Sequence, residues 1–131
     1  DIRLRHCVRG SADAFANSRR RQDRLAELGI RYLHRPDLAP SLAVRHLQDA
    51  ADNAGKTAKR QRADLDPGFV DAYRREVLDG FDSRRFVEDL GETRVVALVC
   101  VERHPAACHR SLLAERLAKD LRVSVKHVLS E

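Results

Sequence analysis

The chain has 131 residues, 43% of them hydrophobic and 34% charged, with a net charge of +5, which is typical of one globular domain with a heavily charged surface. No stretch approaches the roughly 18 apolar residues of a membrane helix, so we expect a cytoplasmic protein without membrane contact. Three cysteines are an odd count and favour free thiols over a disulfide scaffold. The positive charge favours an anionic small molecule or nucleic acid as partner, and the oligomeric state stays open.

The first half of the sequence predicts alternating helical and β-type segments. Leucines at helical spacing predict a helix over 18–28, which Gly29 ends as a C′ residue. The alternating run 30–34 predicts a strand. A short helix begins near residue 41, and the basic, apolar-poor run 56–62 predicts an exposed excursion.

Two further helices are predicted from clear start and stop signals. Asp66 followed by proline begins a helix that extends to Gly80. Its buried stripe consists of Phe69, Tyr73 and Val77. Ser83 is expected to cap a shorter helix that buries Phe86 and Leu90 and ends at Gly91.

The last third predicts a strand, a helix and a second strand. The apolar run 94–101 is typical of a central parallel strand. Leucines at helical spacing predict a helix over 111–121, and 123–128 alternates as a strand does. Such a unit is a right-handed crossover. We therefore expect residues 1–131 to form a single small three-layer α/β domain with a mostly parallel sheet and flanking helices.

The stretch between that strand and that helix is the strongest candidate site. Ligands of open α/β sheets bind beyond the carboxyl ends of the strands. Cys108, His109 and Arg110 would lie there, at a helix N-terminus whose free N–H groups favour an anion or a thiolate. Histidine and arginine beside a cysteine would lower its pKa further. We therefore expect Cys108 to be the reactive thiol, ahead of Cys100 and Cys7.

Structural alternatives exist for the same residues. Cys100 lies in an apolar run, where burial in the core is the default. His109 could cap a carbonyl group, and Arg110 could pair with Glu102. A reversible disulfide between Cys100 and Cys108 is a further alternative.

A zinc site is a minority alternative for this stretch. The atoms would come from Cys100, His104, Cys108 and His109, with His6 and Cys7 nearby. Against zinc, there is no Cys-x2-Cys pair, and adjacent cysteine and histidine residues rarely face one ion. We therefore assign no metal and no cofactor from the sequence.

The same stretch resembles the signature of a protein family known as domain of unknown function 488. That signature is an apolar strand, Cys-x-Glu, a short loop with proline, and Cys-His-Arg, which matches residues 96–111. The segments 1–3, 28–32 and 34–38 are also similar to the family, although Ala39 stands where members commonly have glycine. The resemblance implies an α/β fold but no settled reaction. It also implies a preceding first strand and turn, as does the absence of methionine.

Two functional hypotheses from different classes follow. In the first, the chain is an enzyme acting on a phosphate-bearing or nucleotide-like substrate. Cys108, His109 and Glu102 would be catalytic, while Arg110, Arg3 and Asp1 would bind the anion or orient its ligands. In the second, the chain is a non-catalytic nucleic-acid-binding or interaction module, and the same residues form a structural polar network. An open pocket at Cys108 would favour the enzyme.

Overall fold

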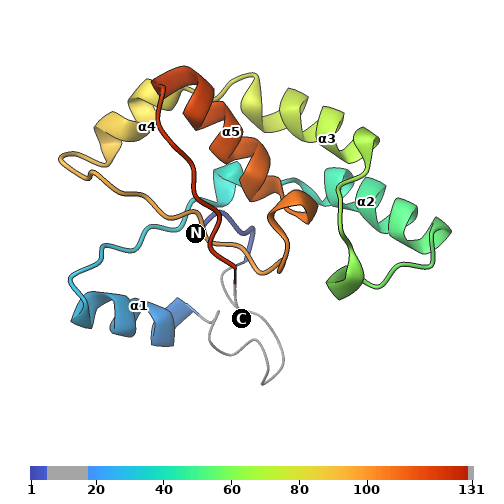
Figure 1. Ribbon diagram of the computed structural model, residues 1–131, viewed down its shortest axis with the longest axis horizontal. Coiled ribbons are helices and arrows are strands. Elements are labelled where there is room, and N and C mark those ends of the chain that lie inside the picture. Colours follow the sequence, from blue (N-terminus) through green and yellow to red (C-terminus); the bar gives the residue numbers. More distant parts are fainter. Residues whose placement is uncertain (6–17, 130–131) are drawn as a thin grey trace.

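The computed structural model describes residues 1–5 and 18–129, and the regular structure in this part of the chain is helical (Figure 1). Its α-helices are α1 (Ser18–Glu27), α2 (Leu42–Ala54), α3 (Pro67–Tyr73), α4 (Ser83–Asp89) and α5 (His109–Leu121). Short 3-10 helices are η2 (Pro36–Leu38), η3 (Lys59–Gln61) and η5 (Pro105–Ala107), and a π-helix, η4 (Arg74–Leu78), continues α3. No helix of the described part is long and apolar enough to cross a membrane.

The predicted α/β domain with a mostly parallel sheet is wrong. Within the described residues, the segments 30–34, 94–101 and 123–128 form no strands. A backbone hydrogen bond from Ile2 N to Val99 O, 3.2 Å long, joins the N-terminal segment to the segment 94–101 at one point, but no ladder develops in the described part. A strand requires a neighbour that takes up its N–H and C=O groups. β-Prone residues alone therefore did not determine the structure of these segments.

The helices pack on one another around one apolar core. α2 packs against α3, and both α3 and α4 pack against α5. α1 lies apart from these four helices (Figure 1). The buried core comprises Ile2, Leu38, Val44, Phe69, Tyr73, Leu78, Phe86, Leu90, Leu112 and Leu113. Burial of the predicted pairs Phe69 and Tyr73, and Phe86 and Leu90, is thereby confirmed.

Several predicted helix ends are confirmed by their hydrogen bonds and dihedral angles. The Asp66 carboxylate accepts from Gly68 N and Phe69 N, 2.8 and 3.3 Å away, at the start of α3. Gly29 and Gly91 have φ of 70° and 63° after α1 and α4. This is the left-handed conformation that favours glycine at a helix C-terminus.

Two predicted helix starts need correction. Asp82, not Ser83, caps α4, because its carboxylate accepts from Arg85 N at 3.0 Å. The Ser83 hydroxyl instead donates to Asp120 of α5 at 2.6 Å. α5 begins two residues earlier than the apolar pattern predicts, at His109, with Cys108 as its N-cap.

The basic run 56–62 is mostly exposed, as predicted, but it is attached to α2 by ion pairs. Lys59 lies 3.1 Å from the carboxylate of Asp49, and the Arg62 guanidinium pairs with the buried Asp52. These acids neutralise part of the basic run.

Candidate functional site: a buried thiol cluster

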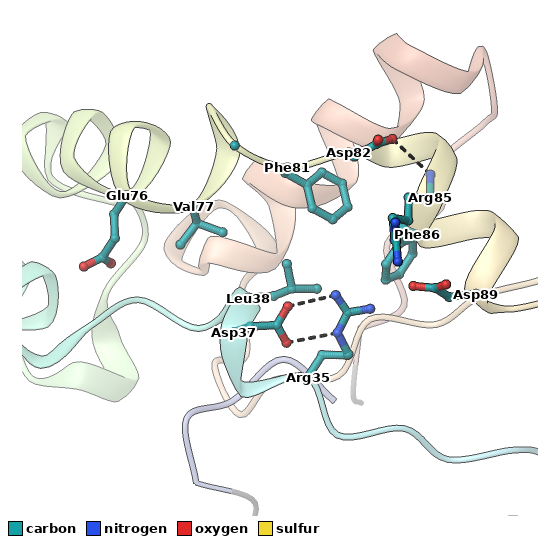
Figure 2. A pocket seen from close by; sticks show the side chains of 11 residues that line it. Arg35, Asp37, Leu38, Glu76, Val77, Phe81, Asp82, Arg85, Phe86 and Asp89 are labelled. Carbon is teal, nitrogen blue, oxygen red and sulfur yellow. Dashed lines mark hydrogen bonds and ion pairs between the residues drawn. The ribbon is translucent and has the colours of Figure 1, made fainter.

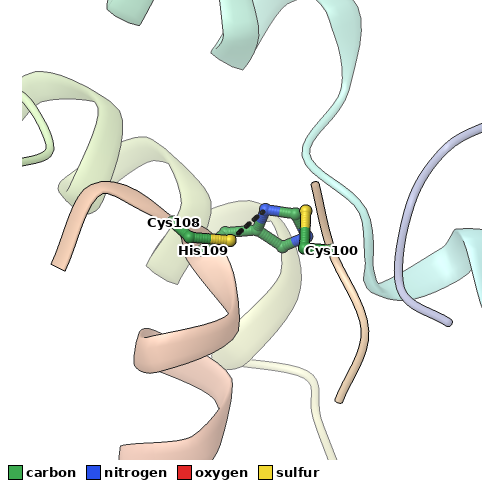
Figure 3. A group of neighbouring side chains, drawn as sticks. All are labelled: Cys100, Cys108 and His109. Carbon is green, nitrogen blue, oxygen red and sulfur yellow. Dashed lines mark hydrogen bonds between the residues drawn. The ribbon is translucent and has the colours of Figure 1, made fainter. Parts of the chain in front are cut away.

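The site is built by the loop after residues 94–101 and by the first turn of α5. Cys108 has extended backbone angles (φ −136°, ψ 137°), and its Sγ accepts from Arg110 N at 3.5 Å. His109 is the first helical residue. Because the chain changes from extended to helical between the two residues, both side chains turn inward toward Cys100 (Figure 3).

The two thiols share one carboxylate. The Cys100 thiol donates to Glu102 Oε2 at 2.7 Å, and the Cys108 thiol donates to the same oxygen at 3.3 Å. Cys108 is buried, with 1% of its surface exposed, whereas Cys100 is half-buried. Both thiols are free; a reversible disulfide between them stays a prediction.

The ring of His109 completes the cluster. Its Nδ1 lies 4.0 Å from Cys108 Sγ, and its Nε2 lies 3.0 Å from the carbonyl oxygen of Ile2. Because a carbonyl can only accept, the proton is on Nε2 and the Nδ1 lone pair faces the sulfur. Burial lowers the pKa of His109, which keeps the ring neutral at pH 7. The edge of Tyr73 packs on this ring, with centroids 5.5 Å apart.

The pKa of Cys108 moves in the direction opposite to our prediction. The pKa of its thiol is raised by hydrogen bonding with Cys100, by burial, and by the negative charge of Glu102. The bond from Arg110 N acts in the other direction but is the smaller effect. Burial would raise the pKa of Glu102, yet the bond from the Cys100 thiol, a backbone hydrogen bond and the bond from the Cys108 thiol hold it below its usual value. The carboxylate therefore stays ionised while Cys108 stays protonated.

Arg110 is engaged by the loop that carries Glu102. Its guanidinium donates to the backbone oxygens of Glu102 and Arg103, 2.7 and 3.2 Å away. These contacts are with the backbone, in place of the ion pair with the Glu102 side chain that was one structural alternative for Arg110. They fasten the loop to the start of α5.

The predicted anion-binding pair at the N-terminal segment forms a cluster of its own. The Asp1 carboxylate is fully buried and accepts from Arg3 at 2.7 and 2.8 Å. It also accepts from Arg21 and from the hydroxyl of Tyr32, each at 2.5 Å. Sequence reasoning missed Arg21 and Tyr32, because nothing in the sequence pattern links α1 or residue 32 to Asp1.

Three of the predicted site residues therefore converge, Glu102, Cys108 and His109, and Cys100 joins them. Arg110 lies beside them, whereas Asp1 and Arg3 are connected to them through Ile2, whose carbonyl holds His109. Sequence reasoning also missed Tyr73 and this carbonyl. A tyrosine within the apolar stripe of α3 was a signal for the first, since a buried hydroxyl needs a partner; here it donates to Leu38 O at 2.7 Å.

A hollow in the surface of the described part lies away from this cluster. It encloses about 330 Å³ between η2 and α4 and is lined in part by Arg35, Asp37, Phe81, Arg85 and Phe86 (Figure 2). Arg35 already binds Asp37 through paired bonds of 2.9 and 2.8 Å. None of the thiol cluster lines this hollow.

Fold and site together define a small helical protein with a buried cluster of thiols, carboxylate and imidazole. Comparison with protein families matches residues 1–117 to the family described as Domain of unknown function DUF488. The chain belongs to this family, as its Cys-x-Glu and Cys-His-Arg residues predict. No curated protein and no solved structure matches the chain.

Proposed function

We propose that this chain is a non-catalytic interaction module, in which the Cys-His-Arg residues belong to a structural polar network that is closed to solvent. We call this network, formed by Cys100, Glu102, Cys108, His109 and Arg110, the clasp. The observation that carries the proposal is the burial of Cys108, which exposes 1% of its surface. A nucleophile must reach the reacting atom of its substrate through an open pocket. Burial and a raised pKa both oppose that role.

The arginines of the site also support a structural role. A phosphate site needs guanidinium N–H groups directed at the ligand. Arg110 directs its donors at two backbone carbonyls, and Arg3 directs a fork of donors at Asp1. These bonds join the loop, the N-terminal segment and α5. Catalytic roles for Cys108, His109 and Glu102 stay predictions that the experiment below tests.

The partner that this chemistry favours is a protein. In the described part, the non-helical segments expose large apolar side chains, with Val95 and Val128 exposed by 86% and 82%. Apolar side chains on extended segments suit contact with another polypeptide, including addition of a strand. Nucleic acid is less favoured, because Lys59 and Arg62 of the basic run already face Asp49 and Asp52.

Alkylation of the folded, metal-free chain with iodoacetamide, followed by peptide mass mapping, tests the clasp. Cys108 should react at least about tenfold more slowly than in the unfolded chain, because burial and a raised pKa both suppress the thiolate. Cys100, half-buried, should react faster than Cys108. Labelling of Cys108 in the folded chain at the rate of the unfolded chain would overturn the proposal and restore the enzyme hypothesis.

A further inference from the structure

We propose that Cys100, Cys108 and His109 bind a thiophilic divalent metal ion of the Zn²⁺ type. This inference rests on the proposed function, because it identifies the ligand that the closed clasp holds. The sulfur atoms of Cys100 and Cys108 and a ring nitrogen of His109 all lie within 4.8 Å of one another. Two sulfurs and an imidazole nitrogen are donors that zinc binds in proteins.

The distances are close to those of a tetrahedral centre. Bond lengths of about 2.3 Å for Zn–S and about 2.0–2.1 Å for Zn–N place tetrahedral ligand atoms roughly 3.5–3.8 Å apart. Cys108 Sγ and His109 Nδ1 are 4.0 Å apart, so a few tenths of an ångström separate them from that spacing. Glu102 Oε2 accepts from both thiols, at 2.7 and 3.3 Å, and would support the two sulfurs from outside the set of ligands.

The proton on His109 is already where a metal ligand requires it. Its Nε2–H is donated to the Ile2 carbonyl, which leaves the Nδ1 lone pair facing the thiols. Zinc-binding histidines use such a bond to a carbonyl to fix the tautomer and the ring orientation. The buried edge contact with Tyr73 holds the ring in the same orientation.

Adjacent cysteine and histidine residues rarely face one ion, but the backbone conformation here allows it. Cys108 is extended and His109 is helical, so the two side chains converge (Figure 3). Binding would displace the thiol protons of Cys100 and Cys108 to solvent. The resulting thiolate at Cys108 would gain from the bond with Arg110 N and from the N-terminal end of α5.

Titration of the full chain with Co²⁺, read by visible absorption, tests the site. Tetrahedral thiolate-bound Co²⁺ should produce strong ligand-field bands and a sulfur-to-metal charge-transfer band with the intensity of two thiolates, and Zn²⁺ should abolish both. Cys100→Ser, Cys108→Ser and His109→Gln should each weaken binding at least about 100-fold, while Glu102→Gln should weaken it about 10- to 100-fold. Glutamine at 109 can keep a bond to Ile2 O but lacks the Nδ1 donor.

The control is His104→Ala, at an exposed histidine of the same loop, which should bind as the parent does. Circular dichroism establishes that each variant is folded, and the charge-transfer intensity of the parent chain decides the thiolate number without any variant. No tetrahedral spectrum in the parent, or an unchanged spectrum in Cys108→Ser and His109→Gln, would overturn the metal site. If the chain fails to bind Co²⁺ while Cys108 remains protected from alkylation without metal, only the proposed metal site is overturned. If Cys108 is alkylated rapidly, the proposed clasp is overturned as well.

Discussion

Cys108 shows how position within a helix and burial compete to set thiol chemistry. The N-terminal end of a helix stabilises a nearby negative charge by about 0.3–1 kcal/mol. Burial of an isolated charged group costs several kcal/mol, and the Glu102 carboxylate, 3.3 Å from the sulfur, opposes a second negative charge. Burial and like charge therefore decide the pKa of Cys108, and the position before α5 does not.

At Asp52, by contrast, a neighbouring cation outweighs the effect of burial on the pKa. Hydrogen bonds from Arg62 lower the pKa of Asp52, although burial would raise it, and a bond from Gln48 lowers it further. A carboxylate with a lowered pKa stabilises the folded state above its usual pKa of about 3.9, and this contribution is lost as the pH falls through the lowered value.

We therefore predict that Asp52→Asn lowers the free energy of unfolding by about 1–3 kcal/mol at pH 7, because Arg62 loses a charged partner. The difference from the parent chain should stay constant down to about pH 5 and shrink below about pH 4. Urea unfolding at several pH values measures it. The matched control is Asp49→Asn, which removes an exposed pair with Lys59 and should cost less than about 1 kcal/mol. An Asp52→Asn effect that is independent of pH would contradict this account.

At the scale of elements, local signals determined the helices. Caps and glycine stops act through hydrogen bonds within a few residues, so Asp66, Gly29 and Gly91 were readable from the sequence. Whether the segments 30–34 and 94–101 form strands could not be derived in the same way, because a strand depends on partners elsewhere in the chain. α5 began early because Cys108 is an uncommon cap that sequence rules do not include.

The cap at Asp66 gives the element-scale prediction. Asp66→Ala removes the acceptor for Gly68 N and Phe69 N and should lower the free energy of unfolding by about 0.5–2 kcal/mol. Asp66→Asn should retain most of the stability, because asparagine caps helices well. The exposed Asp64 is the control, and Asp64→Ala should change stability by less than about 0.5 kcal/mol. Equal losses from Asp64→Ala and Asp66→Ala in urea unfolding would argue against a capping role.

At the scale of the whole molecule, the site fastens together segments that are distant in sequence. Ile2 donates to Val99 and accepts from His109, so the N-terminal segment lies between the loop and α5. Burial in the core was the default for Cys100, whereas the gathering of Glu102, Cys108 and His109 at one site was predicted from the short stretch of sequence that they share. The burial of this group was not, because it depends on Ile2 and on Tyr73 of α3.

The central claim, that the clasp is closed around His109, is tested most directly by long-range ¹H–¹⁵N NMR of the histidine rings in the metal-free chain. We expect His109 to show a single neutral tautomer, protonated at Nε2, with a proton that exchanges slowly because Ile2 O holds it. The exposed His46 should show rapid exchange and averaged tautomers. A protonated ring, the Nδ1–H tautomer, or rapid exchange of the His109 proton would mean that the cluster is open to solvent and would contradict the account.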